Sequence, residues 1–281
     1  MAAAEHDGLL GPDSVAWRVL DHPAALIGGL RALIVQSLHP LAMAGVAQHS
    51  DYRRRPLERL RRTAYYVGAT AMGDNATALA AAQRVKRVHE RVRGIDPVTG
   101  RSYSADDPET QVWIHTVEWH SFLVAYDVFA RRLPVEEQDR YMAEGVRIAT
   151  LLGTPEEMFP ASTAEAREYF ERVQSQLCVS ADAREAIGFV VNPPLTRDLL
   201  PYWAAIRVLG QAALATVPRE LRRLAGIDRP RAVDFAAVTA VRPLVAASTR
   251  PPLRDLYGYA LGRDVRDVHK RGRQVRRRLA A

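Results

Sequence analysis

The segment RVKRVHERVRG, residues 84–94, places one histidine among five Lys or Arg side chains. Val85, Val88, His89 and Val92 recur at the spacing i, i+3, i+4 and i+7, which marks one face of an α-helix. The imidazole is therefore predicted to face the core, with cations around the sides. A neutral imidazole on an apolar face can act as an axial ligand of haem iron. The alternative is a hydrogen-bonded core histidine with no ligand.

The cations nearest to His89 have a use if a haem is bound. Lys86 lies three residues before the histidine and Arg93 four residues after it. Both side chains can therefore reach past the apolar stripe on the same side of the helix. Haem carries two propionate carboxylates, which such cations would neutralise through charge-assisted hydrogen bonds.

Two further histidines lie beside apolar or aromatic residues. His39 precedes Pro40 in IVQSLHPLAMAGV, where a proline is predicted to kink one helix over residues 24–48. A polar ring at such a bend can line a cavity, or it can be a hydrogen-bonded core histidine. His115 follows Trp113 in VWIHTVEWHSF. That segment is typical either of a pocket wall or of aromatic core packing.

Other chemistry-bearing motifs are missing from the sequence. The eight histidines include no His-Glu-x-x-His pair, and no two Glu-x-x-His units could form a di-iron site. A phosphate-binding loop and a nucleophile elbow are likewise missing. A metal site assembled from distant helices stays an alternative. Cys178 is the only cysteine, so a disulfide framework is excluded.

Composition and charge describe an ordinary globular chain. It has 281 residues, of which 48% are hydrophobic and 25% charged, with a formal net charge of +7. Residues 263–281 contribute +6 of that charge, so the rest is close to neutral and sequence-specific nucleic-acid binding is not expected. The basic tail is either the solvated end of a helix or a contact for nucleic acid, an anionic membrane or an acidic partner. With neither a signal peptide nor a run of about 18 apolar residues, we expect a cytoplasmic protein without a transmembrane span.

Helical periodicity dominates the chain, so the sequence predicts an all-α protein. Residues 94–108 have turn chemistry and could form a small hairpin, with Gly94 ending the helix before it. We expect a single domain over residues 1–281, with a possible subdivision at 190–198 and a basic C-terminal helix in 263–281. The predicted helices are 14–20, 24–48, 56–72, 75–93, 108–132, 135–152, 163–177, 181–190, 198–216, 219–226, 232–247 and 264–279.

Two longer segments together resemble a known family. They are HPLAMAGVAQHSDYRRRPLERLRRTAYYVGATAMGD and RVKRVHERVRGIDPVTGRSYSADDPETQVWIHTV. Their order is similar to that of the rubber oxygenase (latex-clearing protein) and MpaB-type haem oxygenase family. An arginine-rich R-x-x-[K/R]-T helix is followed by H-x-x-V-x-G and by Y-x-A-x-D-P…W-x-H. The resemblance covers residues 31 to about 130, and the ordered set is more specific than any one motif.

The resemblance implies an all-helical, globin-like multi-helix bundle that binds b-type haem, with additional helices at its C-terminal end. The family's proximal iron ligand falls on His89, and its propionate-side cations fall on Lys86 and Arg93. Its distal cluster falls on Arg59, Arg62 and Thr63, which share one helical face with Tyr66. Cations and hydroxyls there could hydrogen-bond dioxygen or stabilise charge on it. His39, His115 and Trp113 would line the cavity.

Two departures from the family bear on function. In rubber oxygenase a lysine able to ligate iron stands near the position of Arg62, whereas arginine stays protonated and is a poor ligand. The sixth iron position is then open or filled by a group such as His39. The rubber enzymes are also secreted, and this chain has no export signal, so polyisoprene is not the expected substrate. A small apolar or isoprenoid-like molecule, oxidised with dioxygen at a carbon–carbon double bond, is expected instead.

Two other interpretations stay open from the sequence. One is a non-catalytic haem-binding sensor or carrier, or a helical interaction module whose basic tail binds a partner. A pair of iron ligands at His89 and His39 would favour it, because a filled sixth position hinders dioxygen binding. The other is a helical protein without haem, in which His89 is only part of the core. An all-helical surface is also compatible with a homodimer.

Overall fold

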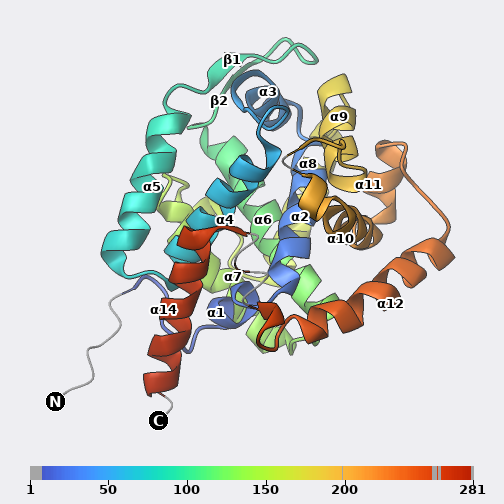
Figure 1. The fold of residues 1–281 in the computed structure, drawn as a ribbon. Helices are drawn as coiled ribbons and strands as arrows, with labels where there is room; N and C mark the ends of the chain where they lie inside the picture. Colours follow the sequence, from blue (N-terminus) through green and yellow to red (C-terminus); the bar gives the residue numbers. More distant parts are fainter. Residues whose placement is uncertain (1–7, 198, 255–257, 259–260, 280–281) are drawn as a thin grey trace.

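The computed structural model describes residues 8–197, 199–254, 258 and 261–279 (Figure 1). Its fold is all-α with one two-stranded antiparallel hairpin, which confirms the predicted class. The helices are α1 (Val15–Leu20), α2 (Ala24–Gln36), α3 (Pro40–His49), α4 (Pro56–Met72), α5 (Asn75–His89), α6 (Pro108–Phe129), α7 (Val135–Thr150), α8 (Thr163–Val173), α9 (Ala181–Val191), α10 (Trp203–Ala215), α11 (Arg219–Leu224), α12 (Arg231–Ala247) and α14 (Arg263–Leu279). The strands are β1 (Arg93–Ile95) and β2 (Ser102–Ser104), and short 3₁₀ turns occupy Glu156–Met158, Gln174–Gln176 and Leu200–Tyr202.

Helices α2 and α6 pack against each other at the centre of the molecule. Helix α6 is apolar on most sides, which is typical of a helix surrounded by protein. It begins at Pro108, and the side chain of Asp107 caps it by accepting a hydrogen bond from the Thr110 amide at 2.9 Å. Gly28 of α2 permits the close approach, because a Cβ there would lie 2.8 Å from the Cα of Phe122.

Helix α5 packs along α4 at the side of this core. Its inward positions are the small residues Ala78, Ala81 and Ala82, and two further turns along the same face lies His89. The predicted apolar stripe is wrong at one position. Val88 lies seven residues after Ala81, on nearly the same face, but it is 57% exposed because it lines an open groove at this end of α5.

The segment around Pro40 corrects the prediction of one kinked helix over residues 24–48. Two helices, α2 and α3, form instead, and their axes differ by 107°. His39 has extended backbone because a residue before proline avoids the helical region, and its Nδ1 accepts a hydrogen bond from the Ala42 amide. Among the described residues no single helix meets the length and hydropathy of a membrane span, and only this bent pair meets them jointly.

The predicted hairpin forms, but the predicted role of Gly94 is wrong. Helix α5 ends at His89, and Gly94 lies inside β1, opposite Tyr103 of β2. A Cβ at Gly94 would lie 2.6 Å from the Tyr103 hydroxyl, which itself donates a hydrogen bond to Gln48 at 2.8 Å. Glycine is therefore needed here for close packing of a tyrosine rather than to end a helix.

We expect Gly94→Ala to lower the free energy of unfolding by about 1–2 kcal/mol, because the added methyl group overpacks the Tyr103 ring. Urea denaturation measures the change, and amide hydrogen exchange should show faster exchange in β1 and β2. Gly11→Ala is the control, since nothing lies within 4 Å of the added Cβ. Equal stability of the two variants would contradict the close contact with Tyr103.

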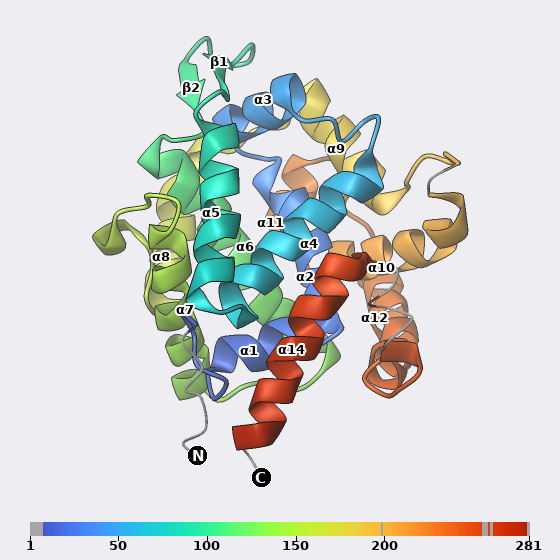
Figure 2. The same ribbon diagram turned by 60° about the vertical axis from the view of Figure 1, so that its left-hand side comes forward.

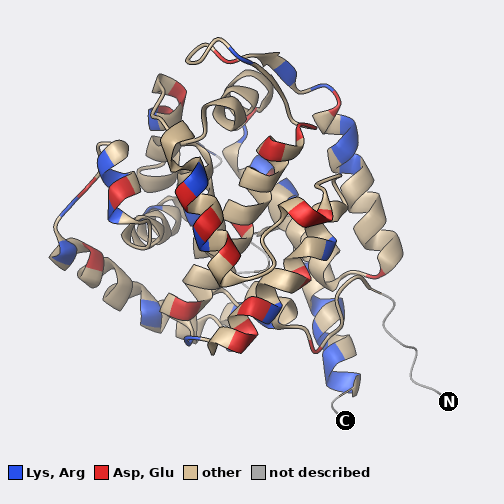
Figure 3. Cartoon of the chain, turned by 180° about the vertical axis from the view of Figure 1, so that it is seen from behind, with Lys and Arg blue, Asp and Glu red and all other residues tan. Residues whose placement is uncertain are grey.

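The C-terminal half adds further helices to the bundle, as predicted. Helix α10 packs against α2, α9 and α12. A division of the chain at residues 190–198 stays a prediction. Basic and acidic residues intermingle over most of the face in Figure 3, and Lys and Arg predominate toward the C-terminal ends of α5 and α14. Residues 280 and 281 of the predicted basic tail lie outside the described part.

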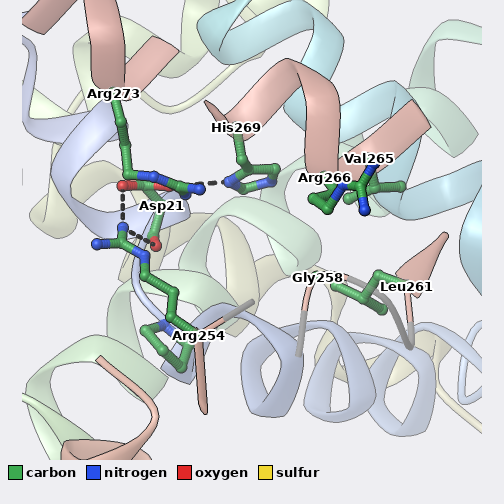
Figure 4. Close-up of a pocket in the computed structure, with 9 residues that line it drawn as sticks. Asp21, Arg254, Gly258, Leu261, Val265, Arg266, His269 and Arg273 are labelled. Atoms are coloured by element: carbon green, nitrogen blue, oxygen red, sulfur yellow. Dashed lines mark hydrogen bonds and ion pairs between the residues drawn. The ribbon is translucent and has the colours of Figure 1, made fainter. Parts of the chain in front are cut away.

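Helix α14 crosses α1 and α4 and fixes them relative to each other (Figure 2). Its buried Val268 and Gly272 face the body of the protein, and Gly272 packs close to Met72 of α4. An ionic cluster anchors the helix beside a cavity of about 20 Å³, which is about the size of one water molecule (Figure 4). At its centre Asp21 contacts three side chains, which are Arg254, His269 at 3.0 Å and Arg273 at 2.9 Å.

Candidate functional site

Helices α4, α5 and α6 direct five titratable side chains toward one another. They are Arg59 and Tyr66 of α4, His89 of α5, and His115 and Glu118 of α6. Electrostatic effects link them in two groups: His89 affects the pKa of His115, whereas Arg59 affects that of Glu118 and Glu118 affects that of Tyr66. His115 and Glu118 are three residues apart on α6, so the two groups meet on one face of that helix. The fold therefore gathers a polar cluster inside an otherwise apolar part of the protein.

His89 lies on the inward face of α5, two turns past the row of alanines. Its Nδ1 is buried and has no hydrogen-bond partner. Burial lowers the pKa of His89, and the charge of Asp106 opposes this only in part. The ring is therefore neutral near pH 7, and a neutral imidazole has the free lone pair that a metal ligand needs.

His115 lies near the middle of α6 and is almost fully buried, with 7% of its surface exposed. Burial lowers the pKa of His115 to about 4, and repulsion from a charged His89 acts in the same direction. The two imidazoles, one on α5 and one on α6, are therefore both neutral near pH 7 and electrostatically coupled. The sequence analysis named both.

Arg59 and Glu118 are opposite charges that face the same interior region. Burial lowers the pKa of Arg59, whose Nε donates a hydrogen bond to Ser50 at 3.2 Å. Burial raises the pKa of Glu118 to about 7, although Arg59 acts in the other direction. Both retain some accessible surface, so protein encloses them without packing tightly against them. A carboxyl group of this kind can hold or release a proton near neutral pH.

Glu118 is the residue of this cluster that the sequence analysis did not assign to the site. It follows His115 by three residues, so the two share one face of α6. The spacing of His115 and Glu118 is the sequence feature that could have identified Glu118. A single carboxylate three residues from a histidine does not form a complete metal-binding motif, so motif rules do not select it.

The three other predicted distal residues take different positions on α4. The Tyr66 hydroxyl is buried without a hydrogen-bond partner, and burial together with Glu118 raises its pKa. Thr63 is half-buried on the same face. Arg62 instead points outward and forms an ion pair with Asp51 at 2.7 Å. The structure therefore brings Tyr66 to Arg59, and it does not bring Arg62 there.

The two predicted propionate partners flank His89 at the protein surface. Lys86 is exposed on one side of α5. Arg93 is exposed in β1 and lies 3.7 Å from Asp106, a loose ion pair that a competing carboxylate could replace. Both side chains are long and mobile enough to turn toward an anionic group beside His89.

His39 and Trp113 belong to a different contact group. Their ring centroids are 5.6 Å apart, and Trp113 donates a hydrogen bond from Nε1 to the backbone oxygen of Gln36 at 3.2 Å. Trp113 also packs edge-on against Phe170 of α8. None of these contacts leads to His89, so these two predicted cavity residues lie with α2 and α8. Their cavity-lining role stays a prediction.

Among the described residues, no three His, Cys, Asp or Glu side chains converge in a manner suited to a metal ion. A haem site is compatible with this arrangement, because the porphyrin supplies four of the iron ligands and the protein needs to supply only one. The cluster around His89 is therefore better suited to a macrocycle than to a bare ion.

Comparison with known proteins identifies the family. The family described as "ER-bound oxygenase mpaB/B'/Rubber oxygenase, catalytic domain" matches residues 17–249. The chain belongs to this family, which confirms the resemblance drawn from the sequence.

Two relatives come from mycobacteria. They are the uncharacterized protein Mb2261 of Mycobacterium bovis and the uncharacterized protein Rv2237 of Mycobacterium tuberculosis. Each is 26% identical over 141 residues, which is 50% of this chain and 54% of the relative. The chain thus spans about half the length of these relatives. No solved structure matches the chain.

Proposed function

We propose that the protein is a haem b-dependent oxygenase that acts on a small apolar or isoprenoid-like substrate. The observation that carries this proposal is the state of His89. It is a neutral, inward-facing imidazole with an unpartnered buried nitrogen, and it is electrostatically coupled to a second neutral histidine, His115, which shares a face of α6 with Glu118. In an oxygenase catalytic domain, such an imidazole is suited to hold haem iron.

The residues present fit a haem group. His89 would hold the iron, and Lys86 and Arg93 would bind the propionates at the surface. Arg59, Tyr66 and Glu118 each retain some accessible surface, which leaves them able to contact a bound group. Bound haem would supply the activation of dioxygen.

The chain's own residues provide the surroundings for that chemistry. The Arg59 guanidinium and the Tyr66 hydroxyl are buried donors that can stabilise negative charge without reorganising. The Glu118 carboxyl group can hold a proton or accept one near neutral pH. The alanines of α5 exclude water from this side and favour an apolar substrate.

The rival function is a haem-binding sensor or carrier with two histidine ligands. It depends on His39 as the second ligand. His39 is engaged elsewhere, since its Nδ1 accepts a hydrogen bond from the Ala42 amide and its ring stacks on Trp113. Moving it to iron would uncap α3, so the catalytic interpretation is favoured.

The test is the visible absorption spectrum of haem-supplemented protein in the ferric and ferrous states. We expect stoichiometric haem and a Soret band in the wild type, and loss of bound haem in His89→Gly because the axial ligand is gone. Added imidazole should restore the band in His89→Gly by occupying the space of the lost side chain. His39→Asn is the matched control, since an asparagine can still cap α3, and its spectrum should be unchanged.

Three results would contradict the proposal. They are a wild type that binds no stoichiometric haem, a His89→Gly variant with an unchanged spectrum, and a His39→Asn variant that changes the spin state. The last of these would favour the two-histidine sensor. If the spectra are as expected, oxygen uptake with short isoprenoid alkenes is the activity assay, and Arg59→Leu should lower its rate about 10²-fold or more through loss of a buried donor.

A further inference from the structure

The remaining cations of the segment around His89 gather on the outer side of α5. Arg84, Arg87 and Arg91 line an open groove of about 460 Å³, together with His49, Val88 and Val92. His89 points the other way, into the protein. The groove is therefore separate from the candidate haem site, although both are built on the same helix.

The groove's arginines have no acidic partner. Among the described residues none of Arg84, Arg87 and Arg91 forms an ion pair or side-chain hydrogen bond. Other surface arginines do have such partners: Arg53 pairs with Glu185, and Arg62 pairs with Asp51. The C-terminal end of a helix favours cations, which accounts for part of this arrangement. The helix end does not account for three neighbouring arginines without a carboxylate. Neighbouring like charges repel one another and are unfavourable.

The spacing of the cations indicates the kind of anion that fits. Arg84 and Arg87 are one helical turn apart, and Arg91 follows in the turn after α5. With a rise of about 1.5 Å per residue, the group spans about 10 Å along the helix, and the long side chains can converge on a shorter anion. Three guanidinium groups carry more positive charge than one phosphate group needs, and they suit two linked ones. Guanidinium groups bind phosphate oxygens through paired hydrogen bonds.

The floor of the groove indicates the rest of the ligand. Val88 is 57% exposed between the arginines, and Val92 lines the same groove. Exposed valines surrounded by cations suit a ligand that is apolar next to its charged end. The volume is also in the range of small-molecule sites, roughly 300–1,000 Å³. We propose that this groove binds a soluble small molecule that carries a diphosphate group on a short apolar stem.

Isothermal titration calorimetry at low ionic strength tests the proposal with inorganic pyrophosphate and isopentenyl diphosphate. We expect saturable one-to-one binding of both, with the isopentenyl compound at least threefold tighter because its stem contacts the valines. Val88→Glu should weaken both at least tenfold by placing a carboxylate between the arginines. Leu79→Glu is the matched control, since Leu79 is also on α5 and 48% exposed, and it should bind within twofold of the wild type.

A second pair of variants keeps the proposal testable if Val88→Glu fails to fold. The double variant Arg84→Ala/Arg87→Ala should lose binding at least tenfold, whereas Arg276→Ala/Arg277→Ala on α14 should not. No saturable binding, or equal loss in the control pairs, would overturn the proposal. It would also be overturned if phosphatidylglycerol vesicles bound through Arg84 and Arg87 while neither soluble compound did, because the groove would then recognise a membrane. The haem spectrum is expected to be unaffected, so the two sites are tested independently.

Discussion

Asp21→Asn is expected to lower the free energy of unfolding by about 3 kcal/mol, because it leaves two partly buried arginines and His269 without the carboxylate that they share. Asp21 is 15% exposed and pairs with Arg254, His269 and Arg273, which come from the C-terminal end of the chain. Asparagine keeps the size of the side chain and removes only the charge. Urea denaturation at pH 7 measures the loss, and limited proteolysis should cut within α14 sooner than in the wild type.

The pH dependence of this effect has a definite sign. Burial alone would raise the pKa of Asp21, but the hydrogen bond and charge of His269 and the charges of Arg254 and Arg273 outweigh it, so the pKa lies below its usual value. The stabilisation is therefore complete above the pKa of the unfolded chain, about 3.9, and is lost as pH falls through the lower folded value. The difference between wild type and Asp21→Asn should shrink in that acidic range.

The control for Asp21→Asn is Asp264→Asn, at an exposed position in the first turn of α14. Its loss should stay within about 0.5 kcal/mol, as for most surface substitutions. If both variants lost the same amount, the ionic cluster around Asp21 would not be what holds α14 against α1 and α4. A loss in Asp21→Asn that grew below pH 4 would contradict the proposed ionisation.

Local sequence rules predicted the helices well, because caps and prolines act within a few residues. Helix α4 begins at Pro56 and ends at Met72, as expected from the proline at its start. The break at Pro40 was stronger than predicted. A kink bends a helix without interrupting it. Here the helix is interrupted, because His39 has extended backbone and its side chain caps a new helix. Whether a proline kinks a helix or ends it depends on what the following segment packs against. Local sequence rules carry no information about those contacts.

The facing of individual side chains was harder to predict, because it is decided by partners distant in sequence. Arg59 and Arg62 differ by about 60° on the helix, so periodicity allows either to face inward. Asp51 holds Arg62 at the surface, and Arg59 is left to face Glu118. Similarly, Trp113 and His115 are neighbours in sequence but point to different sides of α6. The sequence identified the residue types of the site correctly and could not assign all of them to one side.

Glu118→Gln is expected to stabilise the protein above pH 7 by up to about 3 kcal/mol, because it removes the cost of ionising an enclosed carboxyl group. Burial raises the pKa of Glu118 to about 7 from the ordinary value of 4.5. Between these two values the folded protein keeps the proton that the unfolded chain releases, so stability falls as pH rises through this window. Glutamine has no such charge, and the advantage of the variant should vanish near pH 4.5.

The difference between variant and wild type is the quantity to measure, by urea denaturation from pH 4.5 to 8. Burial lowers the pKa of His115 to about 4 and that of His120 to about 3, so both oppose Glu118 by making the protein less stable in acid. Their effect is common to both proteins and cancels. Glu168→Gln, at an exposed position of α8, should show no pH-dependent difference. A constant difference for Glu118→Gln would mean that its carboxylate is not destabilising in the folded state.

The same substitution connects stability with function. An ionised, enclosed carboxyl group lowers the stability of the protein at neutral pH. Destabilising groups of this kind are common in catalytic sites. If Glu118 holds a proton for the oxygenase reaction, the more stable Glu118→Gln variant should bind haem normally and yet lose activity, and the pH profile of the remaining activity should lose the limb near pH 7. If Glu118→Gln gained stability and kept full activity with an unchanged pH profile, Glu118 would have no role in the reaction. Arg59 and Tyr66 would then be the polar groups of this cluster that act in catalysis.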